Sequence, residues 1–211
     1  MKRTPASSLA FALAFPLSVG VASAAADPDP GTDFIKNISY AGSGCPQDSV
    51  VVSIGDDART FKVKYSQFIA EIGPGIPLAR SRKNCQLNLT MRAPQGFSFA
   101  IAAADYHGYA SLAEGAMGLH KATHYFHGVP DQPTTWRGFT GPYEGGWHIH
   151  DEPESAFLAW SPCGVERTTL NVNTQLRLDR RSSSSSSYST MTMESQGVEQ
   201  TYHILWRECG A

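Results

Sequence analysis

The sequence has little charge, and the charge it has is not basic. Charged residues make up 17% of the chain, with 17 Lys and Arg against 19 Asp and Glu. Nucleic acids and anionic membrane surfaces are bound by basic patches. The shortage of positive charge therefore argues against either as the main partner.

Long hydrophobic runs are also missing, apart from one at the start. Lys2 and Arg3 precede an apolar stretch from Leu9 to Ala22, and Ala24 completes a small-residue cleavage site. This order is typical of a secretory signal peptide, and the stretch is too short for a membrane span of about 20 residues. We therefore expect a secreted, extracellular protein with no membrane partner.

The domain organisation follows from this start. We expect a signal peptide over residues 1–24, a flexible leader over 25–33 and a single β-rich domain over 34–211. Without Lys2 and Arg3 the mature chain has 15 basic and 19 acidic residues, a formal charge of −4. A chain of this length can bury one substantial core.

Cysteine is scarce, and no CxxC pair supports a zinc site. Four cysteines behind a signal peptide predict two disulfides. They allow three pairings, of which we favour Cys45–Cys85 and Cys163–Cys209, because each closes its own half of the chain.

Internal repeats, heptads and convincing crossover helices are absent. Apolar residues instead alternate with polar ones, as in Phe61–Tyr65 and Leu170–Leu178, which indicates strands with one wet face. Residues 85–104 resemble a β-hairpin, residues 128–155 a long surface loop, and Ser182–Ser187 a hairpin tip. The pattern predicts an all-β, mainly antiparallel fold, a sandwich or barrel-like single domain.

Motifs of common catalysts are missing as well. The chain has no GxSxG elbow, HExxH, P-loop or GxGxxG. Asp151 with Glu152 or Glu154 could form a glycosidase pair, but carboxylates so close in sequence are more typical of a solvated turn. A non-catalytic role is favoured, and no cofactor is expected.

A family resemblance emerges from motifs spread along the mature chain. The residues that carry it are Gly42-Ser-Gly-Cys-Pro46, Arg82-Lys-Asn-Cys-Gln-Leu-Asn-Leu89, Pro94-Gln-Gly-Phe-Ser-Phe99, Asp105-Tyr-His-Gly-Tyr-Ala110, Tyr125-Phe-His-Gly128, Trp160-Ser-Pro-Cys-Gly164, Leu170-Asn-Val-Asn173 and Trp206-Arg-Glu-Cys209. Together they resemble domain-of-unknown-function family 4360, secreted proteins mainly of filamentous fungi. The resemblance implies a small extracellular domain with cysteines at these positions, and it supplies no reaction.

Histidines form the most distinctive cluster. Six of the seven lie between positions 107 and 150, and His148 and His150 flank Ile149. Residues two apart share one face of a strand, so both imidazoles could bind one copper or zinc ion, with Asp151 adding an oxygen ligand. The alternative is that these are exposed or backbone-bonded histidines.

Aromatic residues of the same region form a second candidate site. Trp136, Tyr143 and Trp147 lie among glycines, and exposed aromatic faces on a β scaffold can stack on sugar rings. The alternative is that these rings cover part of the core. Asn37 and Asn88 begin acceptor sequons and are candidate glycosylation sites in a secretory pathway.

Two functions remain open from the sequence. The first is a secreted, non-catalytic interaction protein that binds an extracellular glycan or protein, directed at a cell wall or at a host as a fungal effector or virulence factor. The second is a secreted metal-binding protein or metal-dependent enzyme centred on His148 and His150.

Overall fold

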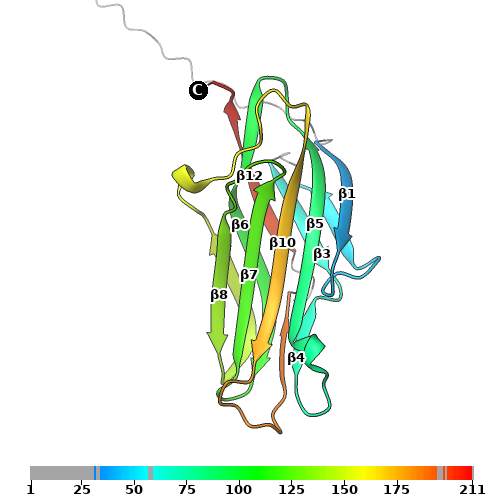
Figure 1. The fold of residues 1–211 in the computed structure, drawn as a ribbon, viewed down its shortest axis with the longest axis vertical. Coiled ribbons are helices and arrows are strands. Elements are labelled where there is room, and N and C mark those ends of the chain that lie inside the picture. The colour runs from blue at the N-terminus through cyan, green and yellow to red at the C-terminus, as the bar shows by residue number, and fades with distance from the viewer. Residues whose placement is uncertain (1–30, 32–33, 57–58, 194–196, 198, 211) are drawn as a thin grey trace, which may run out of the picture.

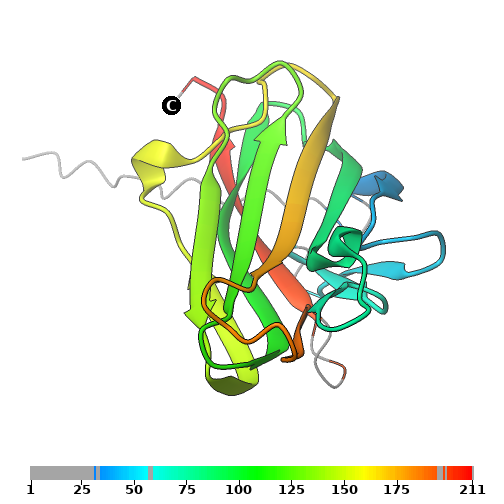
Figure 2. The same ribbon diagram turned by 60° about the horizontal axis from the view of Figure 1, so that its bottom comes forward.

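The computed structural model describes residues 31, 34–56, 59–193, 197 and 199–210, and these form two facing antiparallel β-sheets (Figure 1). Viewed after a 60° turn, the sheets separate into two layers (Figure 2). Strands dominate the described residues, which include two short 3₁₀ turns and no α-helix. No helix in the described part of the chain is long and apolar enough to cross a membrane. The all-β, sandwich-like prediction is thus confirmed, while the predicted signal peptide and most of the leader lie outside the described residues.

The first sheet, called sheet A, faces the viewer in Figure 1. Its strands lie in the order β1, β5, β10, β7, β8. Their bounds are β1 Ile35–Ala41, β5 Arg82–Arg92, β10 Arg167–Asp179, β7 Met117–Phe126 and β8 Thr134–Thr140.

The second sheet, called sheet B, lies behind it, with β6 at its centre. The strand order is β2, β3, β12, β6, β11, β4, and β9 pairs with the other side of β6. Their bounds are β2 Val50–Ile54, β3 Thr60–Tyr65, β4 Ile69–Ile72, β6 Phe97–Leu112, β9 Tyr143–Asp151, β11 Ser189–Thr192 and β12 Gln200–Glu208. The 3₁₀ turns are η1 Leu78–Ser81 and η2 Ser155–Phe157.

Period-two alternation explains why the core lies between the sheets. In β3, Phe61, Val63 and Tyr65 are buried while the intervening lysines are exposed. In β10, every second residue from Thr168 to Leu178 is buried. Strand side chains point alternately to opposite faces, so each strand gives one face to the core and the other to solvent.

The expected hairpin over residues 85–104 is wrong. β5 belongs to sheet A and β6 to sheet B, so the Pro94–Gly96 segment carries the chain from one sheet to the other. Gly96 has a φ of 82°, a value that glycine tolerates and other residues rarely adopt. The Pro94–Gly96 turn signal therefore predicted where β5 ends and β6 begins, but not that the two strands belong to different sheets.

The expected surface loop over residues 128–155 is also wrong in large part. It contains β8, which pairs with β7 in sheet A, and β9, which pairs with β6 in sheet B. The serine run is not a hairpin tip, because it joins β10 of sheet A to β11 of sheet B.

Both favoured disulfides are confirmed. Cys45 bonds Cys85, with Cα atoms 5.4 Å apart, and Cys163 bonds Cys209, with Cα atoms 5.8 Å apart. The first links the turn after β1 to β5, and the second links the segment before β10 to the end of β12. Each bridge restricts the unfolded chain and contributes about 2–4 kcal/mol.

Candidate ligand-binding site

The two histidines predicted to share a face do so on β9. His148 and His150 alternate with the buried Trp147 and Ile149, and both side chains reach the outer face of sheet B. There His148 Nε2 lies 2.9 Å and His150 Nδ1 2.8 Å from the same Oδ1 of Asp105. The cross-strand register explains this convergence, because His150 pairs with Asp105 and His148 with His107.

A third imidazole completes this group, and no local pattern in the sequence predicted it. His203 on β12 brings Nε2 to 3.1 Å from Oδ2 of Asp105. His107 stacks on His148 with ring centroids 4.3 Å apart and planes 3° from parallel. We call Asp105, His107, His148, His150 and His203 the imidazole cluster.

The contacts within the imidazole cluster shift the pKa values of Asp105, His150 and His107. Burial alone would raise the pKa of Asp105, but hydrogen bonds from His150, His148 and His203 lower it to about 2. The hydrogen bond and charge of Asp105 in turn raise the pKa of His150. Burial, followed by the nearby His148, lowers the pKa of His107.

Asp151 does not join these histidines, so the predicted metal set needs correction. Asp151 follows the alternation of β9 to the opposite face and accepts a hydrogen bond from Thr135. Among the described residues, no three His, Cys, Asp or Glu side chains are placed to share a metal ion. Three imidazole nitrogens contact Asp105 instead.

The three predicted aromatic residues do not form one surface. Trp147 is only 4% exposed and packs in the core against His120 and Phe139. Tyr143 donates its hydroxyl to the carbonyl of Gly146 at 2.8 Å. Trp136 stands apart, 67% exposed on β8. A ligand-contacting role for Trp147 is therefore corrected, and Trp136 is the aromatic residue open to a ligand.

Sequence reasoning missed an array of amide side chains on the outer face of sheet A, which one strand, β7, separates from Trp136. These amides alternate with buried residues of two paired strands, β5 and β10. The amide array consists of Asn84, Gln86 and Asn88 of β5 and Asn171, Asn173 and Gln175 of β10. The available signal was that three consecutive outward positions in each alternating run are amides, while charged residues occupy the ends of both runs.

Hydrogen bonds within the amide array fix its orientation. Gln175 donates to Oδ1 of Asn173 at 2.8 Å, and Asn173 donates to Oε1 of Gln86 at 3.0 Å. Gln86 donates to Oδ1 of Asn88 at 3.3 Å. Each amide has two donor hydrogens and an acceptor oxygen with two lone pairs, so half-exposed amides in such a chain keep bonding capacity for a ligand.

Register places Trp136 in line with the amide array. Asn84 pairs with Gln175, Gln175 with Lys121, and Lys121 with Trp136. This row crosses four strands, or roughly 14 Å at about 4.8 Å per step. An extended ligand lying across the strands would thus meet amides, an ammonium group and an aromatic ring in succession.

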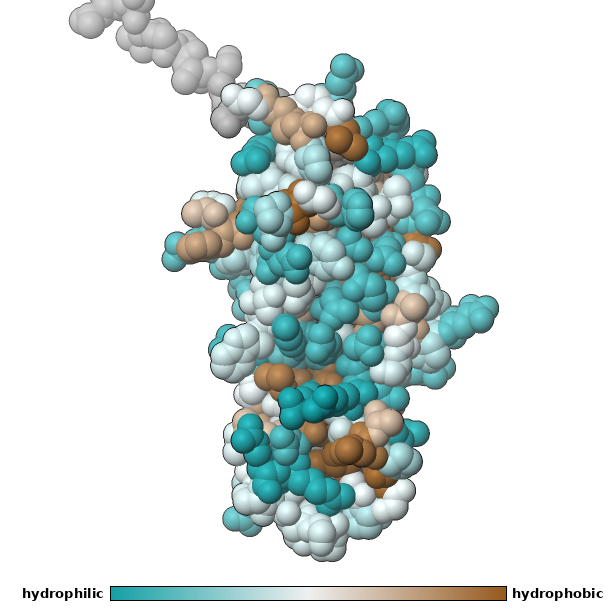
Figure 3. Space-filling view, viewed as in Figure 1, coloured by the Kyte–Doolittle hydropathy of each residue, from teal (hydrophilic) through white to brown (hydrophobic). Residues whose placement is uncertain are grey.

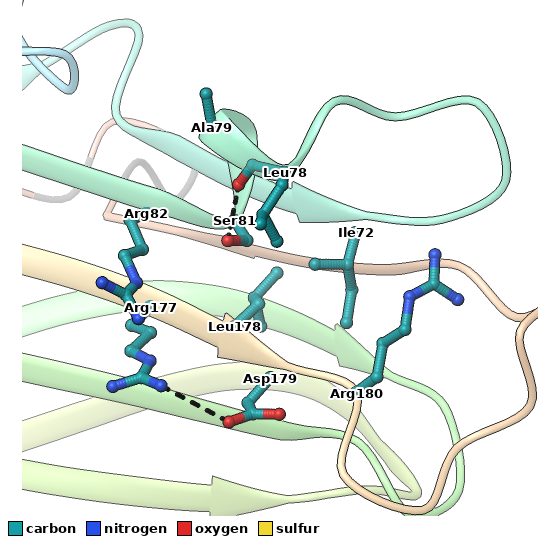
Figure 4. Close-up of a pocket in the computed structure, with 9 residues that line it drawn as sticks. All are labelled: Ile72, Leu78, Ala79, Ser81, Arg82, Arg177, Leu178, Asp179 and Arg180. Atoms are coloured by element: carbon teal, nitrogen blue, oxygen red, sulfur yellow. Dashed lines mark hydrogen bonds and ion pairs between the residues drawn. The ribbon is translucent and has the colours of Figure 1, made fainter.

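Three hollows lie along the end of sheet A that contains Gln175, Arg177 and Trp136. One, of about 590 Å³, lies between η1 and the end of β10, where Leu78, Ile72 and Leu178 meet Arg82 and Arg177 (Figure 4). A second is lined by Asn84, Leu119, Lys121 and Gln175, and a third by Trp136, Gly138 and Arg177 among others. The three hollows share Arg177 in their lining, so they adjoin one another, and we call them together the sheet A groove. Strongly hydrophilic residues border hydrophobic ones in the lower half of this face (Figure 3).

Comparison with known proteins identifies relatives but no activity. The model of the domain of unknown function DUF4360 matches residues 33–209. An uncharacterized secreted protein of Arthroderma benhamiae is 36% identical over 182 residues, covering 86% of this chain and 74% of that protein.

Solved structures are similar only remotely. TmCBM61 in complex with beta-1,4-galactotriose is 8% identical with a TM-score of 0.30, covering 84% of this chain and 92% of that one. The enzymatically active domain of bacteriophage CBA120 tailspike protein 4 is 14% identical with a TM-score of 0.25, covering 86% of this chain and 21% of that one. TM-scores this low carry no inference about the ligand. The family match and the secreted relative are decisive: the chain is a secreted protein that belongs to the DUF4360 family.

Proposed function

We propose that the protein is a non-catalytic, extracellular glycan-binding protein whose ligand lies across the outer face of sheet A. The observation that carries this proposal is the amide array in line with the exposed ring of Trp136, with Lys121 of β7 between them. Amides donate to and accept from sugar hydroxyls, and an aromatic face packs against the apolar face of a sugar ring. The ligand would be a polysaccharide of a cell wall or of a host surface.

The distribution of carboxylates supports binding rather than hydrolysis. Glycoside hydrolysis usually requires two carboxyl groups on either side of the scissile bond. On the four paired strands β5, β10, β7 and β8, which are wholly described, the outward positions carry a single carboxylate, Asp179. A hydrolytic pair is therefore missing from the face that would hold the sugar chain.

The test is a panel of immobilised plant, fungal and animal polysaccharides probed with the intact mature protein. Trp136→Ala is compared with Phe157→Ala, a matched control because Phe157 is also 67% exposed but lies on η2. Loss of an aromatic anchor costs about 2 kcal/mol or more, so Trp136→Ala should weaken binding at least tenfold while the control binds as wild type.

A second variant tests the amide array separately. Gln175→Ala removes the amide between Asn84 and Lys121 in the same row and should weaken binding by a few-fold. Absence of binding to every polysaccharide, or full binding by Trp136→Ala, would overturn the proposal.

A further inference from the structure

Positive charge is concentrated at the sheet A groove although the chain as a whole is slightly acidic. The residues that line its three hollows include six cationic side chains and one carboxylate, Asp179. The cations are Arg82, Lys83, Lys121, Arg177, Arg180 and Arg181. The remaining 11 basic residues are spread over a chain with 19 acidic residues in total. Such segregation creates a local positive potential in an acidic protein.

Two of these arginines face each other across neighbouring strands, so their like charges repel when no ligand is bound. Arg82 on β5 lies directly opposite Arg177 on β10 in the strand register. Figure 4 shows both side chains at the same edge of the hollow, with the guanidinium of Arg177 turned toward Asp179. Like charges directly opposite in a sheet are destabilising. An anion bound between them would relieve this repulsion and accept several hydrogen bonds in a fixed, planar geometry.

The nearest carboxylate balances only part of this charge. Oδ2 of Asp179 lies 3.5 Å from Nη2 of Arg177 and 3.7 Å from Nε of Arg181, so one carboxylate forms ion pairs with two arginines. No ion pair is found for Arg82 or Lys121 among the described residues. The row next to Arg82 and Arg177 contains the amide Gln175, then Lys121, then Trp136. Cations, amides and the aromatic ring therefore occupy one continuous strip.

We infer that the ligand of the sheet A groove is an acidic polysaccharide, whose carboxylates contact Arg82, Arg177 and Lys121 while a sugar ring packs on Trp136. This inference rests on the proposed glycan-binding function and specifies its ligand class. A polysaccharide is favoured over a nucleic acid because the amide array suits hydroxyl groups. The sheet A groove also presents one exposed aromatic ring, Trp136, whereas a single-stranded nucleic acid would need several rings to stack on successive bases.

The experiment compares two ligands with one backbone, polygalacturonate and its methyl-esterified form, by calorimetric titration at low salt. Wild type should bind the acid at least tenfold more tightly than the ester, and binding should weaken as salt rises. The double variant Arg82→Gln/Arg177→Gln should lose about tenfold in affinity for the acid and keep its affinity for the ester.

The same two strands provide a matched control. Arg92 and Arg167 also face each other across β5 and β10, but at the opposite end, where Glu166 lies 3.8 Å from Arg92. Arg92→Gln/Arg167→Gln should bind polygalacturonate like wild type. Circular dichroism and thermal unfolding of both double variants check that each is folded.

Each outcome separates the inference from the proposed function. Equal binding of acid and ester, or an unchanged affinity in Arg82→Gln/Arg177→Gln, overturns the inference and leaves glycan binding intact. Equally tight binding of double-stranded DNA overturns it in favour of a general polyanion site. If no polysaccharide binds, acidic or neutral, the proposed function fails and the inference fails with it.

Discussion

Histidines occupy two contrasting regions of this molecule, the interior of the sandwich and the outer face of sheet B. His120 and His124 on β7 are almost fully buried, and none of their ring nitrogens has a hydrogen-bond partner among the described residues. His148, His150 and His203 are about half exposed and share Asp105. One residue type is thus placed in two opposite electrostatic environments.

The pKa values follow these environments. Burial lowers the pKa of His120 to about 3 and that of His124 to about 4, because a charged imidazole loses its hydration in the core. Asp105 raises the pKa of His150, because its charge and hydrogen bond favour the protonated ring. Acid should therefore weaken the interior while it strengthens the contact between His150 and Asp105.

The largest expected effect is acid destabilisation by the buried pair. Between pH 6.5 and about 4, the unfolded chain protonates at both positions and the folded chain does not, so the free energy of unfolding falls as pH falls. Each imidazole contributes about 1.4 kcal/mol per pH unit, or about 5 kcal/mol for the pair at pH 4.5. Denaturant unfolding at pH 7.5, 6 and 4.5 measures this slope.

His120→Leu tests whether the interior causes that slope. Leucine suits the apolar contacts with Tyr106 and Trp147, whose ring centroids lie 4.7 Å and 5.4 Å from the imidazole. The variant should lose the part of the pH dependence that His120 contributes, about 1.4 kcal/mol per pH unit between pH 6.5 and about 4. An unchanged slope in His120→Leu would mean that this imidazole is solvated in the folded protein.

A smaller effect is expected at the imidazole cluster when Asp105→Asn removes the shared charge. The pKa of His150 should fall, which NMR titration of the imidazole protons detects. Because that pKa is raised in the folded state, the contact stabilises fully below the unfolded value of about 6.5 and is lost as pH rises through the folded value. The cost of Asp105→Asn at pH 5 should stay below about 1 kcal/mol, as for other exposed ion pairs.

Glu152→Gln is the matched control for Asp105→Asn. Its carboxylate lies 3.5 Å from the other ring nitrogen of His150 and contributes less to the raised pKa than Asp105 does. The fall in the pKa of His150 should therefore be smaller than in Asp105→Asn. An equal or larger fall would contradict the central place of Asp105.

Strand periodicity predicted the wet and dry faces of β3 and β10, because alternation is a local property of the sequence. Strand pairing could not be predicted in the same way. The turn at Pro94–Gly96 has the same local signature whether the chain returns within one sheet or crosses to the other. Glycines near Trp147 suggested a loop, although glycine is tolerated in β9.

The candidate sites were predicted only where their residues are close in sequence. His148 and His150 were found because a strand places both on one face. Asp105 and His203 were missed because they are 98 positions apart and meet only through the pairing of β6 with β12. The amide array was missed for the same reason, because Gln86 and Asn173 are 87 positions apart and meet only through strand pairing.

The smallest expected effect is the response of the two histidine regions to salt, which distinguishes charge pairing from burial. Raising ionic strength from about 0.05 to 0.5 M shortens the Debye length from roughly 14 to 4 Å. The charge of Asp105 is then screened, so the pKa of His150 should fall toward its ordinary value in an NMR titration. The acid slope contributed by His120 and His124 should not change, because salt does not hydrate a buried ring. Equal salt responses in both regions would mean that burial is not what lowers the pKa of the interior histidines.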